Sequence, residues 1–252
     1  AQDESLDTHR QLGDLWVVDA LHSIATHCTN MDIHIMEPTY AALWLLSFEH
    51  SNRVRMALRG TLPHAAALLN LDDEVLVEFS KTNKSISGAP HRSRLGQRFL
   101  FLKTCCAGIL WQLAAEPDIV QILIQMRVTN SLVRLLEIPK NHSNSTDNLT
   151  VAEHDALELQ SQLITTALWC TLAITKDDDN FRTAFPEGTD IEYILCDRCI
   201  ELLENYASHG VVVPSLFALQ RLSILCHKQR KYIGQYGLVA SMNFLEVDQN
   251  SL

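Results

Sequence analysis

A seven-residue pattern recurs four times in this chain of 252 residues and constrains its fold more than any other feature. The pattern is close to Ala-Leu-Trp-x-Leu-Ser-x and occurs at 42–48, 109–115, 167–173 and 218–224, with Gln220 replacing the Trp in the last copy. After each copy, a polar break is followed by a second apolar stretch with helical periodicity. Such self-similarity indicates a stacked helical array, in which each unit buries its apolar face on its neighbours.

The composition agrees with an all-α chain. Only 9 Gly and 7 Pro are present, whereas β-rich proteins use more of both in turns. The 7 Cys show no framework spacing, which favours free thiols in a reducing compartment. A net charge of −10 argues against nucleic acid as a partner, and the sequence shows neither a signal peptide nor a membrane-spanning apolar run. We therefore expect a cytoplasmic protein, with the nucleus as the alternative location.

The four copies resemble the third helix of the armadillo repeat, a unit of two shorter helices followed by a long one. The family signature in that third helix is close to Ala-Leu-Trp-x-Leu-Ser-Asn, and 42–48 matches it except at the last position. Residues 52–60 then look like a first helix ending at Gly60, and 62–69 look like a second helix with Pro63 near its start. The resemblance covers about 40–245 and implies an all-α, right-handed superhelical solenoid of about four degenerate armadillo repeats with a divergent N-terminal cap.

The later units are looser, and the whole chain is predicted to be one armadillo-like domain. Further helix pairs are expected at 118–126 and 131–136, at 180–185 and 193–203, and at 228–236 and 238–245. Residues 150–153 have the pattern of a capping box, which predicts a long helix from there to about Ile174. The domain 1–252 divides into divergent N-terminal helices at 1–38, repeats at 39–138 with an inserted loop at 70–90, a polar loop at 139–149, and C-terminal repeats at 150–252.

The resemblance implies a non-catalytic scaffold that binds a partner peptide or helix in the concave groove of the solenoid, without a cofactor. One alternative is a regulatory domain of a larger protein that inhibits a neighbouring domain or self-associates. The other is an enzyme with a nonstandard active site. The enzyme is disfavoured because the sequence contains no G-x-S-x-G, P-loop, HExxH or dinucleotide-binding fingerprint.

The aromatic residues of the repeated pattern are the candidate partner-binding residues: Trp44, Phe48, Trp111 and Trp169. In the nuclear import adaptors of this family, an Asn four residues after the Trp holds the backbone of an extended peptide. Here that position is occupied by Phe48, Ala115, Ala173 and Ile224. The missing Asn weakens the import-adaptor interpretation. The Trp residues could line a binding groove, or they could belong to a helix face that packs against its neighbours.

A basic stretch between Glu78 and Glu116 contains no Asp or Glu, which is unusual in an acidic chain. Its cations are Lys81, Lys84, Arg92, Arg94, Arg98 and Lys103. The functional interpretation is a docking site for an acidic or phosphorylated partner at 81–103. The simpler one is a loop-like insertion with solvated charges.

Two groups of potential metal ligands have simpler explanations. Cys196 and Cys199 have the spacing of half a zinc site or a redox pair, but no second pair follows and no βαβ unit surrounds them. The other group is His22, His27, Cys28 and His34, whose spacing does not suit one helix face. The acidic run 177–180 lacks the Gly and distal Glu of a calcium loop. No metal is therefore predicted.

Overall fold

The computed structural model describes residues 2–14, 16–27, 32–71, 89–137, 151–186, 189–205 and 209–237. Over these ranges the chain forms thirteen α-helices and a π-helical turn at Ile233–Gly237, and no β-strand. The prediction of an all-α fold is thus confirmed for the part of the chain that is described. None of these helices is long and apolar enough to cross a membrane.

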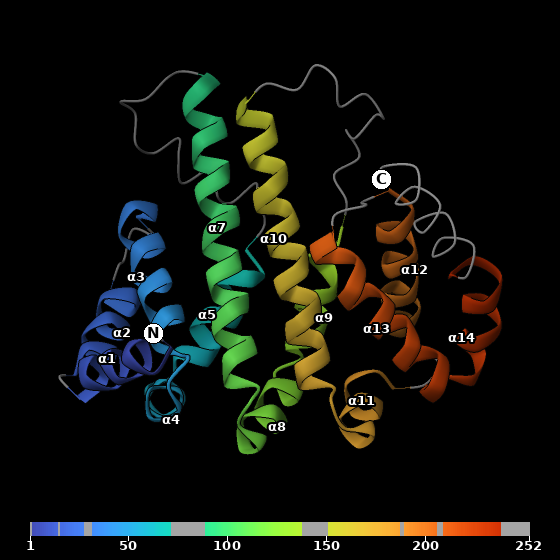
Figure 1. The fold of residues 1–252 in the computed structure, drawn as a ribbon, viewed down its shortest axis with the longest axis horizontal. Helices are drawn as coiled ribbons and strands as arrows, with labels where there is room; N and C mark the ends of the chain where they lie inside the picture. Colours follow the sequence, from blue (N-terminus) through green and yellow to red (C-terminus); the bar gives the residue numbers. More distant parts are fainter. Residues whose placement is uncertain are drawn as a thin grey trace.

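Four helices carry the four copies of the repeated pattern and lie side by side in chain order, each in contact with the next (Figure 1). They are α3 (Ile33–Leu46), α7 (Ala89–Leu113), α10 (Val151–Ile174) and α13 (His209–Leu225). Helix α10 has the bounds that the capping-box pattern predicts. Because each copy lies near the C-terminal end of its helix, equivalent positions of the pattern are brought together on neighbouring helices.

Shorter helices fill the intervals between the long ones. They are α4 (His50–Arg59), α5 (Thr61–Leu69), α8 (Pro117–Gln125), α9 (Val128–Arg134), α11 (Asp178–Ala184), α12 (Asp190–Asn205) and α14 (His227–Tyr232). Helices α5, α9 and α12 pack against α7, α10 and α13 respectively, whereas α4, α8 and α11 lie at the lower end of the view in Figure 1. These helices fall close to the predicted pairs, and the last predicted stretch, 238–245, lies outside the described residues.

Two turns between paired helices have the same left-handed backbone conformation, but different residues adopt it. Gly60, between α4 and α5, has a φ of 84°, in the left-handed region that glycine adopts without steric cost. Arg127, between α8 and α9, adopts the same region with a φ of 55°. A left-handed conformation costs an L-residue about 1–2 kcal/mol, so the packing of α8 and α9 holds this turn in a strained form.

The N-terminal helices α1 (Gln2–Asp14) and α2 (Val17–His27) pack against α3 and α4. Asn52 of α4 is only 1% exposed and links α1 to α3. Its side-chain amide donates to the carbonyl oxygens of His9 on α1 and Leu46 on α3, both at 3.0 Å. The predicted boundary at residue 38 falls inside α3, which begins at Ile33, where the Asp32 side chain accepts from the backbone N–H of His34. The apolar stretch before the first copy therefore belongs to the same helix.

One continuous hydrophobic core runs through the stack from α2 to α13. Both long and short helices contribute fully buried side chains to it, among them Tyr40, Met56, Leu110 and Leu132. The predicted polar loop at 139–149 lies outside the described residues, as does most of the predicted insertion at 70–90. Helix α7 starts at Ala89, within the last two residues of that predicted insertion.

Candidate functional site

Three aromatic side chains from successive long helices make a stacked series. The rings of Trp111 and Trp169 lie 6.2 Å apart between centroids and are nearly parallel, with an angle of 12°. The ring of Phe217 follows at 6.1 Å from Trp169, tilted by 48°. We call Trp111, Trp169 and Phe217 the aromatic row. The two Trp residues occupy the same position of the repeated pattern, and Phe217 lies one helical turn before that position on α13.

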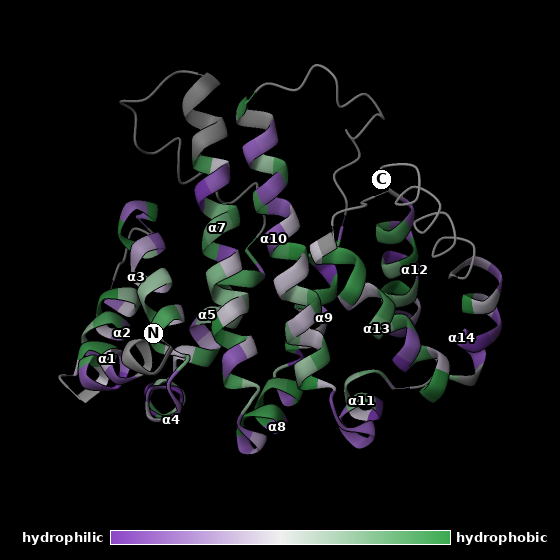
Figure 2. Cartoon of the chain, in the orientation of Figure 1, coloured by the Kyte–Doolittle hydropathy of each residue, from purple (hydrophilic) through white to green (hydrophobic). Residues whose placement is uncertain are grey.

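The aromatic row is partly open to solvent. Phe217 is 49% exposed, and Trp111 and Trp169 are intermediate. Val213 and Leu216 on α13 are also exposed, at 48% and 40%, and Figure 2 shows hydrophobic residues over much of this helix. The row therefore continues into an exposed apolar face of α13, which is the kind of surface that marks binding sites.

Trp44, the first Trp of the pattern, packs differently. Its ring lies directly against Gly108 of α7, so closely that a Cβ at residue 108 would stand 2.3 Å from Trp44 Cε2. Gly108 lies three residues before Trp111, just as Phe217 lies three residues before the pattern position on α13. The indole Nε1 of Trp44 is buried and has no hydrogen-bond acceptor among the described residues. The Trp44 ring therefore packs between α3 and α7, where the absence of a side chain at Gly108 leaves room for it.

A cavity of about 390 Å³ lies among α3, α7, α10 and α13 and is bordered by Trp44. Most of its other lining residues are polar: Thr104, Glu158, Ser161, Gln162, Thr165, Thr166 and Gly210. Its volume lies within the usual range for ligand sites, about 300–1,000 Å³. Among the described residues neither His nor Cys lines it; its polar groups include hydroxyls, one amide and one carboxylate, while most of its exposed surface is apolar.

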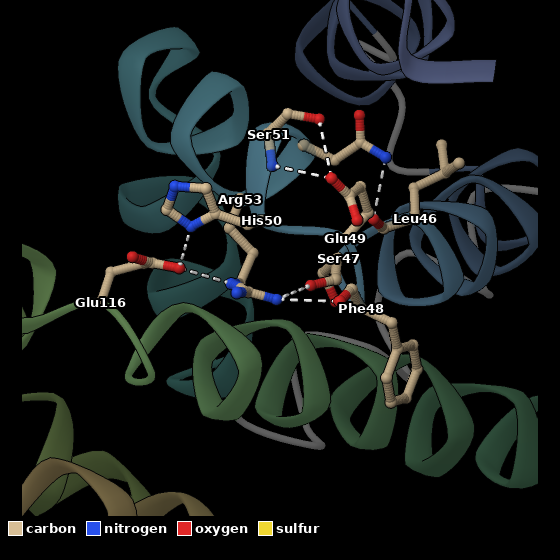
Figure 3. Close-up of polar contacts among 9 residues, drawn as sticks. Leu46, Ser47, Phe48, Glu49, His50, Ser51, Arg53 and Glu116 are labelled. Atoms are coloured by element: carbon tan, nitrogen blue, oxygen red, sulfur yellow. Dashed lines mark hydrogen bonds and ion pairs between the residues drawn. The ribbon is translucent and has the colours of Figure 1, made fainter. Parts of the chain in front are cut away.

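Phe48, the remaining aromatic candidate, is 43% exposed and lies beyond the end of α3. Figure 3 shows its ring pointing away from a group of polar contacts that involves its backbone. In that group, the Arg53 guanidinium donates to the carbonyl oxygens of Phe48 at 2.9 Å and Ser47 at 3.2 Å, and to the Glu116 carboxylate at 2.8 Å. His50 Nδ1 lies 2.7 Å from the same carboxylate. These contacts tie the end of α3 to the α7–α8 turn, which is a structural role.

An equivalent contact recurs at the last copy of the pattern. The Arg230 guanidinium donates to the carbonyl oxygens of Ser223 at 2.8 Å and Ile224 at 3.2 Å. Ser223 and Ile224 occupy the same two pattern positions as Ser47 and Phe48. An arginine thus binds two carbonyl oxygens at the C-terminal end of the helix in two separate copies, where carbonyls lack intrahelical donors.

The basic candidates are placed only in part. Lys81 and Lys84 lie outside the described residues, and Arg92 and Arg94 fall in α7 at positions whose side chains are not described. Arg98 reaches α3, where its guanidinium lies 3.4 Å from the Glu37 carboxylate and 2.7 Å from His34 Nδ1. The charge of Arg98 is therefore balanced within the fold.

The cysteine pair of α12 is buried. Cys196 and Cys199 are both fully covered, and burial raises the pKa of the Cys196 thiol to about 12 and that of Cys199 further still. Metal binding and thiol–disulfide exchange both require the thiolate, which burial disfavours at this site. In the described ranges no three His, Cys, Asp or Glu side chains are grouped to hold a metal ion.

The histidines singled out from the sequence have separate partners. His22 packs edge-on against His64 with centroids 5.8 Å apart, and burial, followed by the charge of His64, lowers its pKa. His27 Nδ1 lies 2.8 Å from the Ser23 carbonyl oxygen, and His34 contacts Arg98. Cys28 lies outside the described residues.

Sequence reasoning missed Phe217 and the polar side chains of α10 that line the cavity. The signal was present: Glu158, Gln162, Thr165 and Trp169 are spaced four, three and four residues apart, which puts them on one face of a helix. Phe217 lies three residues before Gln220, so it occupies the same helix face as the missing Trp.

Comparison of the chain with protein-family models, with curated proteins and with solved structures finds no match.

Proposed function

We propose that this chain is a non-catalytic, armadillo-like repeat scaffold that binds a segment of a partner protein across the aromatic row. The observation that carries the proposal is the stacking of Trp111, Trp169 and Phe217 from three successive helices at a partly exposed surface. Large, rigid aromatic side chains supply much of the binding energy at protein interfaces.

Two further features support the repeat interpretation. Four copies of one pattern lie on four side-by-side helices, and shorter helices pair off between them. In addition, the same pair of pattern carbonyls receives an arginine in two copies, from Arg53 and from Arg230. Equivalent local contacts at equivalent positions are what a repeated unit produces.

The experiment is a selection of displayed random peptides on the purified chain, followed by affinity measurement for the enriched sequences. We expect Phe217→Ser to weaken their binding at least about tenfold, as for the loss of an interface anchor. Because Phe217 is half-exposed, the variant should keep its fold, which circular dichroism checks.

The matched control is Leu58→Ser on α4, which removes an exposed apolar side chain away from the row and should leave affinity unchanged. A selection that enriches no sequence, or sequences indifferent to Phe217→Ser, would contradict the proposal.

A further inference from the structure

The N-terminal end of the helical stack exposes large apolar side chains. In Figure 1, α1, α2 and α4 lie at the opposite end of the molecule from α14. Leu58 on α4 is 83% exposed, the largest value for a large apolar side chain among the described residues, and Trp16, between α1 and α2, is also exposed. The terminal unit of a helical stack normally needs a polar outer face to stay soluble. Apolar side chains at this end therefore mark an interaction surface.

Contacts with Arg55 bring these exposed residues together. The guanidinium of Arg55 lies over the ring of Trp16, 5.3 Å from its centroid, and donates to the carbonyl oxygen of Gly13. Leu58 lies one helical turn beyond Arg55 on α4, and Val54, which is also exposed, lies one turn before Leu58. We call Trp16, Val54, Arg55 and Leu58 the N-terminal patch. It runs from Trp16 across Arg55 to Leu58.

Trp16 is held in a backbone conformation that a bulky residue disfavours. Its φ of 64° lies in the left-handed region, which costs an L-residue about 1–2 kcal/mol. Hydrogen bonds fix the turn on both sides, because the Trp16 N–H donates to the carbonyl oxygen of Gly13 and the Trp16 carbonyl oxygen accepts from Ala20, both at 3.0 Å. Strain of this kind is concentrated at functional sites. The fold thus keeps an aromatic ring on the surface at a position where glycine would be unstrained.

The two helices beside the N-terminal patch have opposite charges. Helix α1 contains four carboxylates and one arginine, a formal charge of −3, whereas α4 contains three arginines and no carboxylate, a charge of +3. Among the described residues, ion pairs do not join these helices: the α4 arginines contact Asp19 and Glu116, and Asp7 of α1 accepts from its own helix at 2.9 Å. Arg55 and Arg59 share Asp19, so α4 keeps an excess of positive charge beside the patch.

We infer that the N-terminal patch binds the same patch of a second copy of this chain, in a two-fold symmetric dimer. In a two-fold interface each surface is opposed by its own equivalent, so it must carry both charges for opposite charges to meet. The acidic α1 and the basic α4 meet this requirement. With Trp16 and Leu58 at the centre, α1 of each copy faces α4 of the other. The aromatic row lies on other helices, so peptide binding and self-association are independent.

The experiment is sedimentation equilibrium of the purified chain over a range of concentrations, in which we expect a reversible monomer–dimer equilibrium. Leu58→Ser and Trp16→Gly should each weaken the dimer at least about tenfold, as for the loss of an interface anchor. Both variants should stay folded, because Leu58 is largely exposed and glycine adopts the left-handed conformation without strain. Ile122→Ser on α8 is the matched control, since it removes an exposed apolar side chain away from the patch, and it should leave the dimer unchanged.

Charge reversal tests whether α1 faces α4 across the dimer. Asp7→Lys places a cation on the exposed surface of α1 and should weaken the dimer, because it then meets the arginines of the second copy. Glu204→Lys makes the same change in net charge at an exposed position of α12 and should not weaken it. Overall charge alone would give the opposite result for Asp7→Lys, since this change makes an acidic chain less negative and reduces repulsion between copies.

The outcomes that contradict a two-fold dimer differ from one another. A chain that stays monomeric at high concentration, or a dimer that Trp16→Gly and Leu58→Ser leave intact, would overturn the inference. Species larger than a dimer would overturn it in favour of head-to-tail pairing with α14, which is also basic. A monomer whose Trp16 indole N–H signal shifts on addition of anionic phospholipid vesicles would assign the patch to a membrane surface instead. None of these results affects the peptide test, in which Leu58→Ser is the neutral control.

Discussion

The first and last interfaces between the long helices use the same pattern position in opposite ways. Between α3 and α7, Trp44 lies against Gly108 and is packed between the helices. Between α10 and α13, Trp169 meets Phe217, which fills the equivalent space and leaves aromatic surface in contact with solvent. All three Trp rings of the pattern are partly buried, so the residue three places before the pattern position on the next helix decides what the ring contacts: a glycine backbone for Trp44 and an aromatic ring for Trp169.

The largest expected effect concerns Gly108. Gly108→Ala places a methyl group inside the Trp44 ring and should destabilise the chain by about 1–3 kcal/mol, the usual cost of overpacking a core. Gly96→Ala on the same helix is the control: no atom of the described residues lies within 4 Å of its added Cβ, so it should stabilise by about 0.5–1 kcal/mol through helix propensity. Urea denaturation measures both, and equal effects at the two glycines would remove the contrast between the interfaces.

The two arginine contacts should differ in their response to acid. Burial opposes ionisation of Glu116, but hydrogen bonds from Arg53 and His50 outweigh it and lower its pKa. A lowered pKa stabilises the folded chain above the ordinary carboxyl range, and this contribution is lost as pH falls through the folded pKa.

We therefore expect Glu116→Gln to cost about 1 kcal/mol at neutral pH, and the gap to the unmodified chain to close in acid. Arg230 has no carboxylate among the contacts described for it, so Arg230→Ala should show a pH-independent loss. The check is the unfolding free energy of each variant between neutral pH and about pH 3, a range that covers ordinary carboxyl titration. A gap for Glu116→Gln that stays constant over this range would show that its charge is not used.

The smallest expected difference lies in the turns. Gly60→Ala forces a side chain into the left-handed region and should cost about 1 kcal/mol. Arg127→Ala exchanges one strained L-residue for another and should change stability by less than about 0.5 kcal/mol. Thermal unfolding followed by circular dichroism distinguishes the two, and a large loss for Arg127→Ala would mean that its side chain stabilises the turn.

Most of the helices could be predicted from residues close to their ends in the sequence. The capping-box pattern before Val151 and the glycine at residue 60 mark helix ends through backbone chemistry that acts within a few residues. The turn at Arg127 carries no such signal, since packing of α8 and α9 imposes its conformation. The start of α3 at Ile33 also has a local signal, since the Asp32 side chain accepts from the backbone N–H of His34.

The candidate site is harder to predict from the sequence than the helices are, because its contacts join residues that lie far apart in the chain. The pattern located Trp111 and Trp169, but their stacking depends on how α7 and α10 pack together. Arg98 looked unpaired because its partner Glu37 lies on another helix. What each Trp ring contacts depends on the small or large residue that the next helix brings against it, which the pattern alone does not contain.

The most direct test of the binding surface uses the indole N–H signals of the four Trp residues, assigned with single Trp→Phe variants, during titration with an enriched peptide. The account predicts that the signals of Trp111 and Trp169 shift together, while that of Trp16, 62% exposed beside the N-terminal helices, stays in place. A peptide that binds without moving the Trp111 and Trp169 signals, or that moves only Trp16, would show that the partner lies elsewhere on the molecule.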